Sequence, residues 1–202
     1  MTFLGIVSHK EHKKWQYPTP FLPYFHFYEI HESKPINAPA REIIQAVKKF
    51  DTSDDIFTNA LINIRSLPIY LLGKLTNSKK FQHHDFGLET FTILNENDHE
   101  ISMGLTGRFW QANLGVIHQP DCESFMSFND DTSAKLVLRF LTKEYPDGYR
   151  SLVTETFIFC PNKKTQKICT LYWFAIRPAS GFIRKRMLST IVRKFKNFNR
   201  AE

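Results

Sequence analysis

The stretch that decides the fold runs from Ser133 to Cys160 and reads SAKLVLRFLTKEYPDGYRSLVTETFIFC. It holds two segments in which apolar and polar residues largely alternate, and a period of two is typical of a β-strand with two different faces. Between the two segments, Pro-Asp-Gly at 146–148 is a strong turn signal. The stretch therefore predicts two antiparallel strands, 133–145 and 150–160, joined by a tight turn.

Further strands are expected on the N-terminal side of this pair. Residues 100–110 alternate between apolar and mostly small or polar side chains, as a half-buried strand does. Residues 88–94 form another candidate strand, and the polar run 95–99 separates the two as a turn. A weaker strand is expected over 124–128. Because short turns join most of these segments, we expect an antiparallel meander.

The region before the meander combines one strand with two short helices. Residues 21–32 are rich in aromatic side chains and read as a first strand, with Pro23 confining its start to a sheet edge. Apolar residues from Ala40 to Phe50 recur at helical spacing, and a second helix follows. The apolar face expected for this second helix is Ile56, Phe57, Ala60, Leu61 and Ile64.

The end of the chain is predicted to be helical. Apolar stripes at helical spacing cover 165–176 and 182–198, and Pro178 lies between them, where a proline breaks or kinks a helix. The predicted order is thus a strand, two short helices, a meander and a long kinked terminal helix. We expect one α+β domain over residues 21–202, preceded by an N-terminal arm over residues 1–20.

Several motifs, taken in their order along the chain, resemble the START-like superfamily, also called SRPBCC or helix-grip proteins, which includes polyketide cyclases. The sequence over roughly residues 24–198 is similar to that of an uncharacterised bacterial branch of this superfamily. The motifs are Gly107-Arg108-Phe109-Trp110, Thr154-Glu155-Thr156, Tyr172-Trp173, Ile176-Arg177-Pro178-Ala179-Ser180, Ile183-Arg184 and Leu188. The resemblance implies a curved antiparallel sheet wrapped around the long C-terminal helix, with a cavity between them.

From the helix-grip order and the supply of aromatic residues we expect binding or carrying of a hydrophobic or amphipathic small molecule, without catalysis and without a cofactor. The chain has 19 Phe, 7 Tyr and 3 Trp, which suit either a cavity lining or a solid core. An enzyme of the polyketide-cyclase kind, acting on an apolar substrate, is the first alternative. The residues expected to line the cavity are Arg108, Trp110, Glu155, Phe157, Tyr172, Trp173 and Ile176.

Glu155 is the carboxylate whose setting matters most. It shares a strand face with Val153, Phe157 and Phe159, so it is expected to point into an apolar interior. Such a carboxyl either serves acid–base chemistry or forms a structural ion pair. The structural pair is the favoured interpretation, with Arg108, Arg139 or Arg177 as partner, and a solvated Glu155 is a third alternative. Phe157 stands where the family often has an arginine.

The basic residues are concentrated at the C-terminal end. Residues 156–201 contain eleven Lys or Arg and no Asp or Glu. An amphipathic helix of this kind can lie on an anionic membrane surface, can attract nucleic acid, or can simply present a solvated face, which is the favoured interpretation. The membrane-surface residues of the second alternative function are Arg184, Lys185, Arg186, Arg193, Lys194 and Lys196.

The cysteines and histidines indicate no metal site. Cys122, Cys160 and Cys169 are odd in number and lack close paired spacing, and His118 or the His83-His84 doublet lacks further ligands at zinc spacing. The first residues do not have the order of a secretory signal, and no run reaches the roughly 18 apolar residues of a membrane span. We therefore expect a cytoplasmic protein, with membrane-surface association as the alternative.

Overall fold

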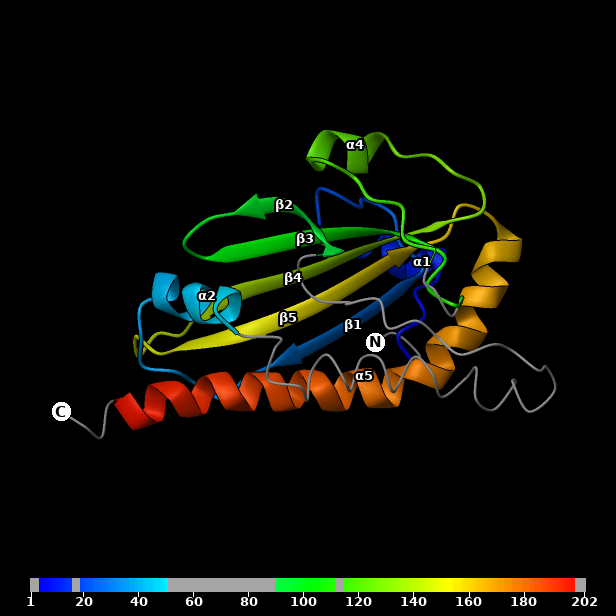
Figure 1. Cartoon of the computed structure of the whole chain (residues 1–202). Helices are drawn as coiled ribbons and strands as arrows, with labels where there is room; N and C mark the ends of the chain where they lie inside the picture. Colours follow the sequence, from blue (N-terminus) through cyan, green and yellow to red (C-terminus); the bar gives the residue numbers. More distant parts are fainter. Residues whose placement is uncertain (1–3, 16–18, 51–89, 112–114, 199–202) are drawn as a thin grey trace, which may run out of the picture.

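The computed structural model describes residues 4–15, 19–50, 90–111 and 115–198 (Figure 1). They form an α+β protein, as expected, with one five-stranded antiparallel sheet and a long C-terminal helix, α5 Lys163–Phe198. The described part also contains the shorter helices α1 His9–His12, α2 Ala40–Lys48 and α4 Cys122–Ser127. The strands are β1 Phe27–Glu32, β2 Thr92–Glu96, β3 Glu100–Gly107, β4 Ala134–Glu144 and β5 Arg150–Phe159.

The sheet is a meander completed by one long-range pairing. The strands β2, β3, β4 and β5 lie side by side in sequence order, and β1 pairs with β5 at the edge. The strands predicted over 100–110, 133–145 and 150–160 are confirmed with slightly shorter bounds, and the one predicted over 88–94 is found at 92–96. The first strand is confirmed only from Phe27 onward, where its ladder opposite Ile158 begins.

The strand predicted over 124–128 is wrong, because these residues belong largely to the helix α4. Asp121 caps this helix, since its side chain accepts a hydrogen bond from the backbone N–H of Ser124 at 2.8 Å. Only Phe125 of its residues is buried. The segment is too short for its weak alternation of apolar and polar residues to define a strand, and the capping residue Asp121 stabilises a helix there instead.

The helix predicted from Ala40 to about Phe50 is confirmed as α2. Its buried residues are Ala40, Ile43, Ile44 and Val47, which lie three or four apart and so share one face. The second short helix, predicted over 56–64, lies outside the described residues.

The terminal helix is continuous through Pro178. A proline inside a helix removes one backbone N–H donor, and its ring clashes with the carbonyl four residues earlier, so the usual result is a kink. Figure 1 shows that α5 changes direction part-way along its length. The two helical segments predicted over 165–176 and 182–198 are thus one kinked helix.

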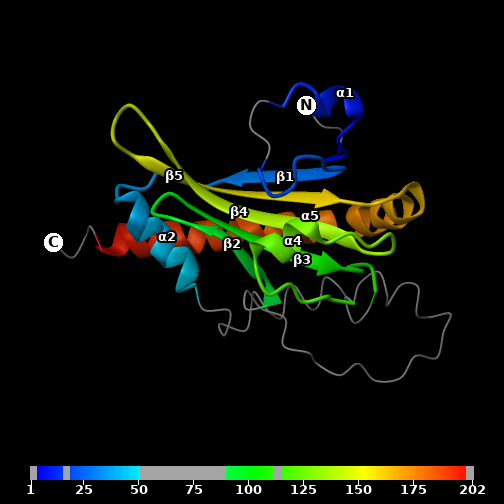
Figure 2. The same cartoon turned by 90° about the horizontal axis from the view of Figure 1, so that it is seen from above.

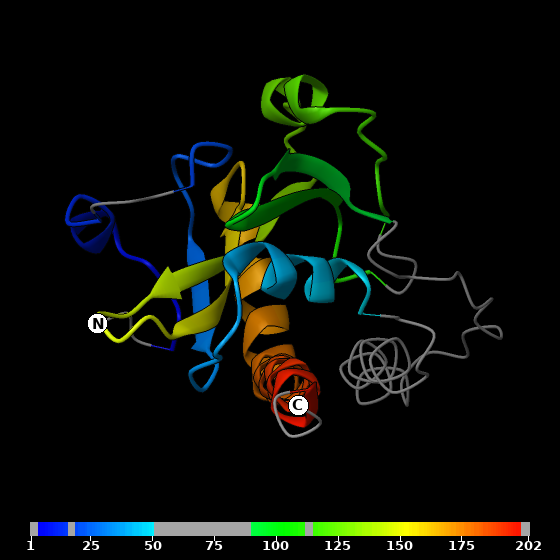
Figure 3. The same cartoon turned by 90° about the vertical axis from the view of Figure 1, so that its left-hand side faces the viewer.

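The two faces of the sheet are covered differently. Figures 2 and 3 show α5 on one side of the strands and α4 on the other. We call the side that carries α5 the helix face and the opposite side the outer face. The helix face holds two apolar clusters, one around Phe140, Leu152 and Met187 and the other around Phe27, Ile158 and Trp173. The outer face holds a third cluster, which includes Phe25, Phe125 and Phe157.

The first described residues, which belong to the predicted N-terminal arm 1–20, pack on the sheet. Ile6 forms an isolated antiparallel bridge with Phe27 at the edge of the sheet. Val7 is buried in the cluster of the outer face. The carbonyl of Leu4 accepts a hydrogen bond from the indole of Trp173, on the helix side, at 3.0 Å.

Candidate functional site: a polar cluster under the terminal helix

Four polar side chains form a patch on the helix face, on the edge strand β1 and its neighbour β5. Glu29 and His31 alternate along β1, and the ladder pairs them with Thr156 and Thr154 of β5. Directly paired residues carry Cβ atoms about 5 Å apart, so the four side chains stand next to one another. The exposed fractions of Glu29, Thr154 and Thr156 are 6%, 0% and 1%. The patch therefore interrupts an otherwise apolar buried face.

The helix α5 passes closely over this patch. A Cβ atom on Gly181 would lie 3.3 Å from both Glu29 Oε1 and His31 Cε1, so the absence of a side chain allows the close approach. Arg177 Nε lies 3.8 Å from Glu29 Oε1, and His31 Nε2 lies 3.2 Å from the same oxygen. Arg184 follows Gly181 by three residues, close to one helical turn, and is half-buried.

We call Glu29, His31, Thr154, Thr156, Arg177 and Arg184 the polar cluster. Each contributes an atom that is shielded from solvent and makes no hydrogen bond, although His31 Nε2 and Arg177 Nε contact Glu29 Oε1 as ion pairs. A buried polar group left unpaired costs about 1–3 kcal/mol, and most such groups in native proteins have a partner. The other four atoms, on Glu29, Thr154, Thr156 and Arg184, would be satisfied by a polar partner from outside the chain, either water or a ligand. The six shielded atoms are Glu29 Oε2, His31 Nε2, Thr154 Oγ1, Thr156 Oγ1, Arg177 Nε and Arg184 Nη1.

The charges of the polar cluster favour an anion as that partner. Two guanidinium groups face one carboxylate, and this carboxylate, Glu29, is already contacted by His31 and Arg177. Among the described residues, no salt bridge pairs Arg184 with an acid. Burial lowers the pKa of Arg184, and the charge of Glu29 opposes that shift. Because a buried cation without a counter-charge is costly, an anionic group near Arg184 would stabilise the folded protein.

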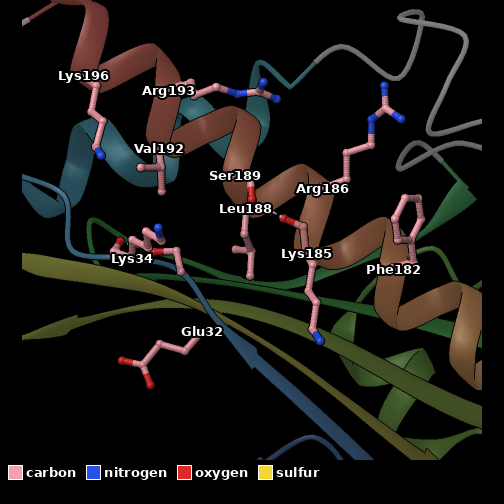
Figure 4. Close-up of a pocket in the computed structure, with 11 residues that line it drawn as sticks. Glu32, Lys34, Phe182, Lys185, Arg186, Leu188, Ser189, Val192, Arg193 and Lys196 are labelled. Carbon is pink, nitrogen blue, oxygen red and sulfur yellow. Dashed lines mark hydrogen bonds between the residues drawn. The ribbon is translucent and has the colours of Figure 1, made fainter.

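A groove of about 860 Å³ opens between α5 and the end of β1 (Figure 4), and its lining begins at Glu32, next in sequence to His31 of the polar cluster. In Figure 4, Leu188 and Val192 point toward the sheet, whereas the ring of Phe182 points away from it. The groove and the polar cluster are built from neighbouring residues of the sequence. Glu32 follows His31 on β1, and Lys185 follows Arg184 on α5. The basic residues that line the groove are Lys34, Lys185, Arg186, Arg193 and Lys196.

Comparison of the chain with protein-family models, with curated proteins and with solved structures gives no match. The resemblance to the START-like superfamily is therefore still an expectation. The function has to be argued from the residues of the chain itself.

Four of the residues expected to line a cavity lie on the helix side of the sheet. Trp173 is buried, and its ring centroid lies 5.5 Å from that of Phe27. Tyr172 and Trp110 are partly buried against the same apolar cluster. Ile176 is half-buried next to Arg177 on α5. The aromatic members of this group are part of the packed core beside the polar cluster.

Arg108 follows the end of β3 and makes a local contact. Its Nη2 donates a hydrogen bond to the Thr132 hydroxyl at 2.8 Å. The same hydroxyl donates to the carboxylate of Asp130 at 2.9 Å. These contacts give Arg108 a structural role beside Thr132 and Asp130.

Glu155 and Phe157 lie on the outer face, so they cannot share a cavity under α5 with Trp173. This corrects the expectation that the predicted residues line one cavity. Arg139 Nε donates to Glu155 Oε2 at 2.7 Å, and Arg139 Nη2 lies 2.5 Å from the same oxygen in a salt bridge. The hydroxyl of Tyr28 donates to Glu155 Oε1, and burial together with this carboxylate raises the pKa of Tyr28. Glu155 is thus a buried member of a structural ion pair with Arg139.

Five of the six residues predicted to face a membrane surface are exposed on α5, namely Lys185, Arg186, Arg193, Lys194 and Lys196. Arg184 is the exception, and its prediction as a surface residue is corrected. It lies on the side of α5 that faces the sheet, three residues after Gly181, and its Nη1 is shielded from solvent. Its position in the helix, and not its basic character, decides its role.

The sequence alone did not reveal that Glu29, His31, Thr154 and Thr156 lie together. A signal was present, because Thr154 and Thr156 share a strand face with Leu152 and Ile158, and two polar residues in the middle of an apolar face are unusual. The sequence did not show that β1 pairs with β5. Without that pairing, Glu29 and His31 could not be placed beside the two threonines.

Two negative findings concern only the described ranges. No helix there is both long and apolar enough to cross a membrane. No three side chains of His, Cys, Asp or Glu are grouped there so that they could hold a metal ion.

Proposed function

We propose that this chain binds an anionic amphipathic small molecule, with the charged head in the polar cluster and the apolar part along the groove. The observation that carries the proposal is the shielded, unpaired Nη1 of Arg184, which interacts electrostatically with Glu29, the ladder partner of Thr156 with its unpaired hydroxyl. Guanidinium and hydroxyl donors that converge in a buried place are suited to a carboxylate or phosphate group.

The groove supports the amphipathic part of the proposal. Ligand sites are concave and mostly apolar, with a few polar groups that fix the orientation of the ligand. Leu188 and Val192 line the groove but are only 2% and 6% exposed, so most of the apolar surface at the groove comes from Phe182 on its rim. The lysines and arginines around the groove would raise the local concentration of an anionic ligand.

In this proposal α5 lies across the hollow of a curved sheet, as a helix-grip fold requires. Support comes from the burial of α5 residues on both sides of the kink, with Trp173 at 3% exposure and Ile191 at 0%. The close approach at Gly181 places the helix directly over Glu29 and His31. A ligand held there would contact both the sheet and the helix.

We propose binding rather than catalysis. The alternative of a polyketide-cyclase-like enzyme predicted Glu155 or another polar group in a solvent-connected pocket, and Glu155 is engaged by Arg139 and Tyr28 on the outer face. A carrier needs only the shape and charge of the site.

The proposal is tested with two probes of equal chain length, decanoate and decanol, titrated into the purified protein by calorimetry. Decanoate is expected to bind more tightly than decanol, because only its carboxylate can pair with Arg184. Arg184→Met keeps the length of the side chain but removes the charge. This variant is expected to weaken decanoate binding about 10- to 100-fold, the usual effect of losing a charge-assisted hydrogen bond.

Lys164→Met is the matched control, because Lys164 is an exposed cation on the same helix outside the polar cluster. It is expected to leave decanoate binding unchanged. Failure of both probes to bind would contradict the proposal. If both variants weaken decanoate binding equally, α5 attracts anions through its net positive charge, and Arg184 is not a specific binding residue.

A further inference from the structure

A second feature of α5 is a set of exposed apolar side chains, three before the kink at Pro178 and one after it. Leu171 is 75% exposed, Phe182 65%, Phe174 42% and Ile168 37%. We call these four residues the outer stripe. The buried residues Cys169 and Trp173 lie between them in sequence but on the opposite side of the helix, so the outer stripe does not belong to the core.

The surroundings of the outer stripe are basic throughout. Residues 163–196 contain ten Lys or Arg and no Asp or Glu. Lys163, Lys164 and Lys167 are exposed at the start of α5, and Lys185 and Arg186 are exposed just beyond Phe182. The helix α5 therefore combines exposed large apolar side chains with positive charge, and its residues 163–196 carry no acidic side chain.

This combination limits the partner that fits. A second copy of the chain packed helix against helix would bring lysine against lysine, which repels. The phosphates of a nucleic acid would pair with the lysines. A nucleic acid, however, offers no apolar surface large enough to cover Leu171. An anionic bilayer presents phosphate groups at its surface and hydrocarbon directly beneath, and so it matches both features.

We propose that the outer stripe of α5 docks on the surface of an anionic lipid bilayer. The apolar side chains enter the boundary between headgroups and acyl chains, and the flanking lysines contact lipid phosphates. Phe182 also lines the groove, so docking would bring one end of the groove to the membrane surface. Leu171 and Phe174 do not line the groove, so the docking surface can be tested separately from ligand binding.

The test is flotation of the full chain with vesicles of phosphatidylcholine alone and of phosphatidylcholine mixed with phosphatidylglycerol. The protein is expected to float only with the mixed vesicles, and to float less as the salt concentration rises, because salt screens surface charge. The double variant Leu171→Glu with Phe174→Glu is expected to reduce the bound fraction at least about tenfold, since it places charge where apolar side chains enter the bilayer.

The matched control is Ile93→Glu with Met126→Glu. These residues are 54% and 52% exposed and lie on β2 and α4, so the control adds the same charge to exposed apolar positions elsewhere. It is expected to bind the mixed vesicles nearly as well as the unchanged chain. An equal loss in both double variants would overturn the proposal, because net charge alone would then explain the binding.

Two further outcomes separate the remaining possibilities. Failure of the unchanged chain to float with mixed vesicles would overturn the proposal. If that chain instead sediments as a dimer that Leu171→Glu with Phe174→Glu dissociates, the outer stripe binds a second copy. Arg184→Met is expected to float normally, so loss of decanoate binding and loss of flotation report on two different surfaces.

Discussion

Glu155 shows how the position of one residue in a ladder decides its chemistry. The sequence offered three arginines as partners for this carboxylate, and the structure selects Arg139. The selection could have been predicted from the turn at 146–148. The ladder pairs Glu144 with Arg150 across the turn, and five steps outward along each strand bring Arg139 opposite Glu155. Arg177 and Arg108 are instead engaged by Glu29 and Thr132.

This buried pair leads to a stability prediction. Arg139→Met leaves the Glu155 carboxylate buried without its cation, because the side chains of Arg139 and Glu155 are only 13% and 8% exposed. Breaking such a pair by removing one partner typically costs about 3–5 kcal/mol in the free energy of unfolding. Urea denaturation at neutral pH, followed by circular dichroism, measures that loss.

The comparison variant is Lys48→Met, which breaks the pair of Lys48 with Glu96. That pair is 37% and 34% exposed, so its loss is expected to cost at most about 1 kcal/mol. Equal costs for the two variants would show that Glu155 is not stabilised by its pairing with Arg139.

At the scale of elements, the packing of α4 on the sheet depends on a glycine. A Cβ atom on Gly104 of β3 would lie 2.7 Å from ring carbons of Phe125, the buried residue of α4. Gly104→Ala therefore has to displace the ring, and overpacking of this kind usually costs about 1–3 kcal/mol. The measurement is again the free energy of unfolding in urea.

A double-mutant cycle identifies the cause of that cost. Phe125→Leu replaces the ring with a smaller side chain, so adding it to Gly104→Ala relieves the contact. The double variant is expected to be more stable than the sum of the two single costs predicts. If the two costs simply add, Gly104→Ala acts on the strand itself and does not act through α4.

The elements differ in how far the sequence predicts them. The strands β3, β4 and β5, the helix α2 and the kinked α5 follow from apolar spacing and turn residues, which are local signals. The helix α4 has only six residues, so spacing cannot define it, and its place depends on Gly104 and Phe125, which are far apart in the sequence. Local patterns predict long elements well and short, contact-dependent elements poorly.

At the scale of the whole molecule, the polar cluster exists because distant segments meet. Glu29 and His31 come from the first strand, Thr154 and Thr156 from the last, and Arg184 from the terminal helix. The sequence predicted each of these elements, but it did not predict that β1 and β5 are neighbours. A pairing between strands more than a hundred residues apart leaves no local signal, so the candidate site could be recognised only from the assembled fold.

The last prediction concerns the segment 4–15, which covers the edge of the sheet beyond β1. The Gly5 carbonyl accepts a hydrogen bond from the Tyr28 N–H at 2.8 Å, so the segment occupies backbone groups that a free edge strand would offer to another chain. Removal of residues 1–15 is therefore expected to raise the average mass measured by sedimentation velocity, increasingly so at higher protein concentration. Trp173→Phe removes only the indole hydrogen bond to Leu4 and is expected to sediment as the unchanged chain does. If the shortened chain also sediments unchanged at every concentration, the segment does not protect the edge, and its contribution is confined to the packing of Val7 and Trp15.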